Sequence, residues 1–112
     1  MIDLCLNSKG ARQDFPFDDT TMVFKVAEKM FALINLTQPF SINLKCAPEY
    51  AVTLRQKYAS ITPGYHMNKK HWNTILLDGD VPDQLQKELV AHSYDLTLKK
   101  LPRTIQHEIL HS

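Results

Sequence analysis

The segment Lys69-Lys70-His71-Trp72-Asn73 brings together the side chains best suited to contact a nucleic acid. Two lysines can neutralise phosphates, with release of counterions. An asparagine can read an adenine edge, and an indole can stack on an exposed base. The alternative is that Trp72 belongs to the core, that the lysines only solvate a loop, and that His71 or Asn73 caps a turn. Strand alternation favours a core position for Trp72.

Four other basic residues are secondary candidates for the same interface. Lys45 is expected on the polar face of a strand, beside Ser41 and Asn43. Arg55 and Lys57 are expected on the outer face of a helix, and Lys29 lies at the start of a strand. An ordinary surface charge is the better explanation for each of them alone, and an exposed ion pair with Glu49 or Glu28, which would contribute little stability, would account for some.

The segment His107-Glu108-Ile109-Leu110-His111 matches the H-E-x-x-H pattern of zinc metalloproteases. A helix would place both imidazoles on one face, with the glutamate as a base. We reject this interpretation because the chain continues only to Ser112 and offers no third ligand downstream. Cys5 and Cys46 are predicted to be buried, unreactive thiols. No glycine-rich phosphate loop or catalytic constellation is found, so we expect no enzyme, no metal and no cofactor.

Composition predicts one folded domain over residues 1–112. The chain is 44% apolar and 22% charged, with a net charge of +1. These values are typical of globular proteins and exclude intrinsic disorder. Residues 45–72 carry five lysines and arginines against Glu49 alone, together with His66 and His71. A basic stretch in a nearly neutral protein indicates a polyanionic partner or a merely solvated face.

The sequence shows no stretch near the roughly 20 apolar residues that a membrane span requires. Asp3 stands where a secretory signal would be basic. We therefore expect a cytoplasmic protein with both cysteines reduced.

Periodicity predicts an α+β fold. Alternation over residues 40–46 is typical of a strand with one buried face, and the runs 22–26, 30–36 and 72–77 are also strand-like. Short helices are expected at 2–7 and after Pro102, and longer ones after Pro48 and Pro82. The expected order is α-β-β-β-α-β-α-α, an antiparallel four-stranded sheet with helices packed on one face.

The segment Tyr65-His66-Met67-Asn68-Lys69-Lys70-His71-Trp72-Asn73-Thr74-Ile75-Leu76-Leu77-Asp78-Gly79 closely resembles the signature of the YjbR/MmcQ family of small bacterial proteins. Further matches cover nearly the whole chain: Phe15-Pro16-Phe17, Phe24-Lys25-Val26, Lys29-Met30-Phe31-Ala32-Leu33, Val81-Pro82-Asp83, Ser93-Tyr94-Asp95-Leu96 and Leu101-Pro102. The resemblance implies DNA binding and a CyaY-like (frataxin-like) fold that presents paired wings to the duplex. Members usually carry Gly-Lys where this chain has Glu28-Lys29, which leaves the geometry of that turn open.

Taken together, these features predict a monomeric, non-enzymatic protein that binds double-stranded DNA weakly and largely without sequence preference. Contacts would come from Lys69, Lys70 and Lys45, with His71 and Asn73 near the groove. The alternative is a frataxin-like adaptor that binds a metal or a protein partner and has no affinity for DNA. A fold does not by itself carry a function, so both hypotheses stay open at this point.

Overall fold

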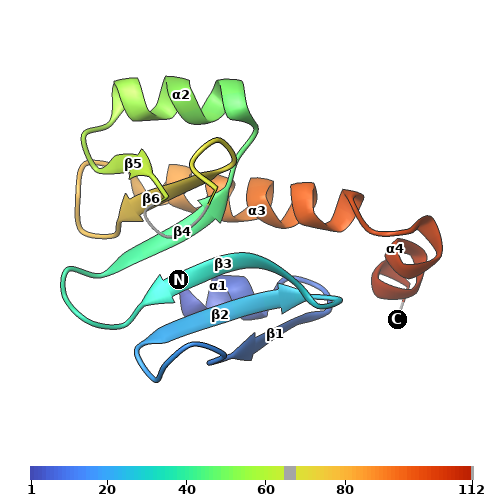
Figure 1. Ribbon diagram of the computed structural model, residues 1–112. Helices are drawn as coiled ribbons and strands as arrows, with labels where there is room; N and C mark the ends of the chain where they lie inside the picture. The colour runs from blue at the N-terminus through green and yellow to red at the C-terminus, as the bar shows by residue number, and fades with distance from the viewer. Residues whose placement is uncertain (65–67, 112) are drawn as a thin grey trace.

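A six-stranded antiparallel sheet in the order β1-β2-β3-β4-β6-β5 forms one layer of the protein (Figure 1). The structure is a computed structural model that describes residues 1–64 and 68–111. The strands are β1 (Ala11–Asp14), β2 (Thr21–Val26), β3 (Lys29–Asn35), β4 (Ser41–Lys45), β5 (Ile61–Pro63) and β6 (Trp72–Leu76). The helices are α1 (Ile2–Leu6), α2 (Pro48–Lys57), α3 (Asp83–Lys99) and α4 (Arg103–Leu110).

The prediction of four strands is wrong, because two short edge strands were not recognised. Strand β1 has the sequence ARQD, and it is exposed from Arg12 onward. An edge strand that does not alternate buried apolar with exposed polar side chains cannot be distinguished from a loop by its sequence. Strand β5 has three residues and includes Pro63, which an edge strand tolerates because one side of it needs no hydrogen bonds. The CyaY-like, frataxin-like fold therefore does not fit, and the order is α-β-β-β-β-α-β-β-α-α.

The main core lies between the sheet and the first three helices. Phe24, Phe31, Ile42, Leu44 and Ile75 are fully or almost fully buried on the inner face of the sheet. The buried apolar residues of the helices join the same cluster: Cys5, Ala51, Leu54, Leu89, Val90 and Leu98. All three helices thus cover one face of the sheet. Figure 1 shows α3, the longest of them, running along the sheet from one end to beyond the other.

A second, smaller cluster lies on the outer face of the sheet. Val23, Leu33 and Trp72 are at most 5% exposed, and Met30 packs against them. The ammonium group of Lys45 lies 5.5 Å from the centre of the Trp72 ring, a distance that permits a cation–π contact. The interpretation of Trp72 as a core residue is therefore confirmed.

Two local features concern backbone conformation. Gly10 adopts a positive φ of 75° in the turn before β1, where the Ala11 N–H donates to the Ser8 carbonyl, and it does not cap α1, which ends at Leu6 with Asn7 as its C-cap. Ala27 and Glu28, which join β2 to β3, have φ values of 47° and 70°. The hairpin therefore keeps a left-handed two-residue turn although neither residue is glycine.

In the described part of the chain, no helix has the length and apolar character needed to cross a membrane.

Candidate nucleic-acid interface

The strand register brings most of the lysines and arginines to one end of the sheet. Val26 pairs with Lys29 and Lys45 pairs with Trp72, so β2 and β4 end where β3 and β6 begin. We call the segments 9–12, 25–29, 45–49, 68–72 and 97–103 the basic pole. It carries Lys9, Arg12, Lys25, Lys29, Lys45, Lys69, Lys70, Lys99, Lys100 and Arg103, with Glu28 and Glu49 as its carboxylates.

The opposite end of the sheet carries the reverse charge. We call the segments 1–3, 15–20, 36–40, 57–60 and 77–83 the acidic pole. It carries Asp3, Asp18, Asp19, Asp78, Asp80 and Asp83, against Lys57. The net charge of +1 therefore results from two strongly charged ends that nearly cancel, and not from an evenly mixed surface.

Three lysines, Lys29, Lys45 and Lys100, lie near enough at the basic pole for their charges to act on one another. Lys45 is half-buried at the end of β4, and burial lowers the pKa of its ammonium group. The charges of Lys100 and Lys29 lower this pKa further. In the described part of the chain, none of the three has a carboxylate within ion-pair distance. An anion placed among them would relieve this mutual repulsion.

Helix α3 is fixed against β3 and β4 through Ser93. The Ser93 hydroxyl donates a hydrogen bond to the Phe31 carbonyl (2.5 Å) and accepts one from the Lys45 backbone N–H (2.9 Å). Ser93 is fully buried, so both bonds are shielded from water. The last turn of α3 is thereby fixed beyond the start of β3 and the end of β4, which brings Lys100 to the basic pole.

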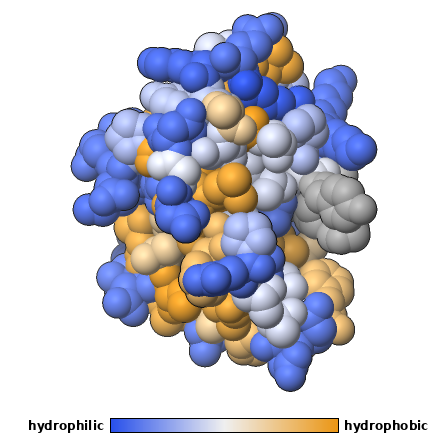
Figure 2. Space-filling view, turned by 90° about the vertical axis from the view of Figure 1, so that its left-hand side faces the viewer, coloured by the Kyte–Doolittle hydropathy of each residue, from blue (hydrophilic) through white to orange (hydrophobic). Residues whose placement is uncertain are grey.

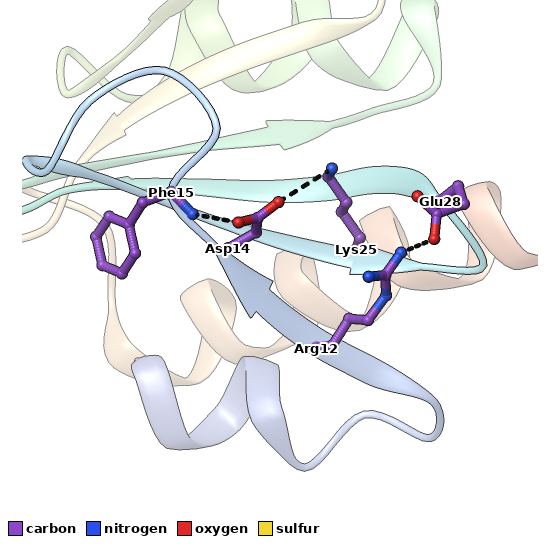
Figure 3. A network of polar contacts seen from close by, with 5 residues as sticks. All are labelled: Arg12, Asp14, Phe15, Lys25 and Glu28. Carbon is purple, nitrogen blue, oxygen red and sulfur yellow. Dashed lines mark hydrogen bonds and ion pairs between the residues drawn. The ribbon is translucent and has the colours of Figure 1, made fainter.

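Other basic side chains of this pole already have partners, as Figure 3 shows for the hairpin of β1 and β2. Arg12 forms an ion pair with Glu28, and Lys25 lies 3.5 Å from a carboxylate oxygen of Asp14. Lys9 donates to the Leu110 carbonyl, and Lys99 pairs with Asp95. These four are less available to an anion than Lys29, Lys45 and Lys100.

The two lysines of the signature segment lie on a tight turn at the same pole. Lys69 and Lys70 are exposed. The Asn68 side chain accepts a hydrogen bond from the Lys70 N–H (2.9 Å), which is the pattern of an Asx-turn. Arg55 reaches this turn from α2 and donates a hydrogen bond to the Lys69 carbonyl. The first residues of the signature, 65–67, including His66, lie outside the described residues.

Asn73 does not face an open groove. It is 2% exposed, and its Oδ1 atom accepts a hydrogen bond from Arg55 Nε at 2.6 Å. Asn73 pairs with Leu44 in the register, and both side chains point toward the helices. The Nδ2 atom of Asn73 has no hydrogen-bond partner among the described residues. In this structure Asn73 therefore presents no edge to a base.

The remaining sequence candidates are divided between the two poles. His71 is half-buried at the basic pole, where its carbonyl accepts the Cys46 N–H. Lys57 lies at the acidic pole, with its ammonium group 5.5 Å from the centre of the Tyr58 ring. Arg55 is half-buried, and its Nε and Nη2 atoms donate the hydrogen bonds to Asn73 and Lys69 described above. Lys100 was missed because its place follows from the docking of α3, which no local pattern reveals.

The histidines and cysteines show no metal-binding arrangement in the described part of the chain. No group of three or more His, Cys, Asp or Glu side chains there could hold an ion. The rings of His107 and His111 lie with their centres 4.2 Å apart. Burial raises the pKa of Cys5 to about 12 and that of Cys46 to about 11, so both thiols are protonated at neutral pH.

Comparison with known proteins places the chain among small bacterial relatives. The family model described as YjbR matches residues 6–96. The chain belongs to the YjbR family. The family member YjbR of Escherichia coli (strain K12) is 34% identical over 103 residues, which are 91% of this chain and 87% of that protein. YbdF of Escherichia coli O157:H7 is 36% identical over 97 residues, or 85% of this chain and 79% of that one.

Solved structures agree with the YjbR assignment and with the six-stranded fold. The crystal structure of Deinococcus radiodurans protein DR2400, with domain DUF419, superposes with a TM-score of 0.90 at 44% identity. The match covers 96% of this chain and 83% of that one. A crystal structure of a Pseudomonas syringae protein, structural genomics target PsR293, gives a TM-score of 0.75 at 31% identity and covers 86% and 94%.

Proposed function

We propose that this YjbR-family protein binds double-stranded DNA through its basic pole, mainly by contacts with phosphates, and that it catalyses no reaction. The observation that carries the proposal is the half-buried Lys45 with Lys29 and Lys100 around it and no carboxylate partner in the described part of the chain. An anion bound among the three ammonium groups would offset their mutual repulsion. A duplex supplies such anions at regular spacing.

The expected affinity is modest and strongly dependent on salt. Lys29, Lys45, Lys69, Lys70 and Lys100 are the lysines of the basic pole without a described ion pair or hydrogen bond from their ammonium groups. Each contact between a lysine and a phosphate contributes about −0.9 to the slope of log affinity against log salt. Non-specific binding of this kind falls near 10⁻⁴–10⁻⁶ M, as an order of magnitude, at physiological salt.

The acidic pole supports the proposal by restricting orientation. Its carboxylates are repelled by DNA, so the protein approaches with the lysines of the opposite end first. With Asn73 buried, the described residues that face the duplex are mostly lysines, which contact phosphates and not base edges. The proposal is therefore binding with little sequence preference.

The test is a fluorescence-anisotropy titration on two unrelated duplexes at several salt concentrations. Lys29→Ala with Lys100→Ala removes two exposed charges from the basic pole, and Lys57→Ala with Lys87→Ala removes two exposed charges elsewhere. We expect the first pair to flatten the salt slope by about 2 on both duplexes and the second pair to change it little. Failure of the wild-type protein to bind at low salt, or an equal effect of the two pairs, would contradict the proposal.

Two further variants define the extent of the interface. Lys45→Met keeps the apolar stem of the side chain against Trp72 and removes only the charge, so we expect weaker binding and a nearly unchanged fold. Lys69→Ala with Lys70→Ala tests whether the signature turn contributes. If that pair has no effect while Lys29→Ala with Lys100→Ala does, the DNA path crosses β3, β4 and α3 without reaching the turn.

A further inference from the structure

An apolar groove opens at the acidic pole, at the far end of the sheet from the proposed DNA interface. Its volume is about 490 Å³, and it lies between α1 and the ends of β3 and β6. Ile2, Ile34, Leu36, Phe40 and Leu77 form most of its wall. Figure 2 faces this end of the molecule and shows apolar surface gathered there, edged by hydrophilic side chains.

Large apolar side chains are exposed around this end of the sheet. Phe40 is 40% exposed at the groove itself. Phe15, Phe17 and Leu76 belong to the same end and are 41%, 62% and 37% exposed. Single exposed apolar residues are common, and of these four side chains only Phe40 lines the groove, where its exposure adds to the apolar wall.

The charges that surround the groove have one sign. Asp3 lines it, and Asp78 and Asp80 lie one and three residues after Leu77. Hydrogen bonds from Ser60 and from the Ala59 N–H lower the pKa of Asp80, and those from Thr20 and Thr21 lower that of Asp18. The groove therefore carries acidic side chains at its rim, with Asp3 in the lining and Asp78 directly after Leu77.

We infer that this groove docks a segment of a partner protein in which one or two large apolar side chains lie among lysines or arginines. The apolar side chains would fill the groove, and the basic ones would face the aspartates of the rim. A second copy of this chain fits less well, because a symmetric contact through the acidic pole would bring like charges together.

The position of the groove relative to the proposed DNA interface indicates what role this interaction would have. The DNA proposed for the basic pole and the partner proposed for the acidic pole would lie at opposite ends of the strands. Both could therefore be bound at once, and the protein would connect a basic partner to DNA. The groove itself does not depend on the DNA proposal, and its test uses no DNA.

The test uses NMR titration of the ¹⁵N-labelled full chain with three capped peptides. The first is Lys-Lys-Leu-Phe-Lys-Lys, the second is Glu-Glu-Leu-Phe-Glu-Glu, and the third is Lys-Lys-Ser-Ser-Lys-Lys. We expect only the first to bind with saturating shifts centred on Leu36, Phe40 and Leu77. The second peptide lacks the charge complementarity, and the third lacks the apolar side chains.

Variants then localise the contact. Phe40→Ala should weaken binding of the first peptide about tenfold, as expected when an apolar anchor loses its wall. Asp3→Asn with Asp78→Asn should weaken it about threefold, and the matched pair Glu88→Gln with Glu108→Gln should have little effect. Equal binding of the glutamate peptide, shifts centred elsewhere, or concentration-dependent dimerisation through Phe40 would each overturn the inference.

Discussion

The Nε atom of Arg55 lies 2.6 Å from the Oδ1 atom of Asn73, and this hydrogen bond ties α2 to the start of β6. The same guanidinium group donates to the Lys69 carbonyl, so one side chain connects a helix, a strand and the exposed lysine turn. Arg55, which faces inward, therefore fixes the position of segment 69–73, which the sequence predicts as an interface.

Arg55 is expected to act as a positioning residue. Arg55→Met removes the donors and leaves Asn73 Oδ1 and the Lys69 carbonyl unpaired, which should lower the free energy of unfolding by about 1–3 kcal/mol. Arg55→Lys keeps the charge but not the planar donor fork, so it should recover only part of the loss. Urea unfolding measures both. Arg103→Lys, at an exposed site, serves as the control, and an equal effect there would contradict the role.

The turn between β2 and β3 should become more stable when residues that favour positive φ values replace the two that are present. Ala27 and Glu28 adopt positive φ values that cost about 1 kcal/mol or more for residues with a Cβ atom. Ala27→Asn with Glu28→Gly introduces the pair typical of such turns. Thermal unfolding should show a gain of several degrees, since 1 kcal/mol corresponds to about 4–8 °C in a domain near this size.

Two substitutions of Glu28 distinguish the effect of backbone strain from the effect of the negative charge. Glu28→Ala removes the carboxylate and its exposed ion pair with Arg12, which contributes little stability, but keeps the strained backbone. Both Glu28→Ala and Glu28→Gly should tighten DNA binding by about two- to fivefold, because each removes a negative charge from the basic pole. Only Glu28→Gly should raise the melting temperature. A stabilised Glu28→Ala variant would show that backbone strain is not the cause.

The acid sensitivity of the fold should depend in part on Asp80. Hydrogen bonds from Ser60 and Ala59 lower the pKa of Asp80 in the folded state. They therefore contribute stability above the unfolded value of about 3.9, and that contribution is lost as pH falls through the folded pKa. Asp80→Asn should be less stable than the wild type at pH 7, with a difference that shrinks toward pH 3. The control is Asp78→Asn, and thermal unfolding at a series of pH values is the measurement.

Both thiols should be protected from alkylation in the native protein. With pKa values of about 12 and 11, Cys5 and Cys46 have almost no thiolate at pH 8, and both are buried. We expect iodoacetamide to label them only as fast as the protein unfolds, and at the rate of free cysteine in concentrated urea. Mass spectrometry follows each site. Rapid native labelling of Cys46 would indicate an open route to the thiol.

The sequence predicts strands well where one face is buried and poorly at the edges of the sheet. Alternation of Ile42, Leu44 and Cys46 marks β4, because this central strand buries these side chains, although Phe40 in the same pattern is 40% exposed. Strand β1 contributes backbone hydrogen bonds to β2 but no buried side chain, so its residues carry no periodic signal. In the sequence, Pro63 indicates the end of a secondary-structure element. In the structure it is the last residue of the edge strand β5.

The sequence predicts only part of the candidate site, because long-range contacts place the rest. Lys69 and Lys70 are exposed, as a charged turn suggests. Trp72 and Asn73 are neighbours on opposite faces of β6, and both are buried, Trp72 in the small outer cluster and Asn73 beneath the helices. An asparagine in such a strand cannot be distinguished from an exposed one by pattern alone. The joining of Lys29, Lys45 and Lys100 depends on register and helix docking, which are long-range properties.

The separation of charge along the strands gives the protein a large electric dipole moment despite a sequence pI of about 7.8. In an external field such a molecule experiences a torque even where it experiences little net force. Ion exchangers of either sign should therefore retain it near its isoelectric point, each by a different end of the molecule. The same torque would orient the protein at a distance from a charged polymer, within about one Debye length, before any side chain makes contact.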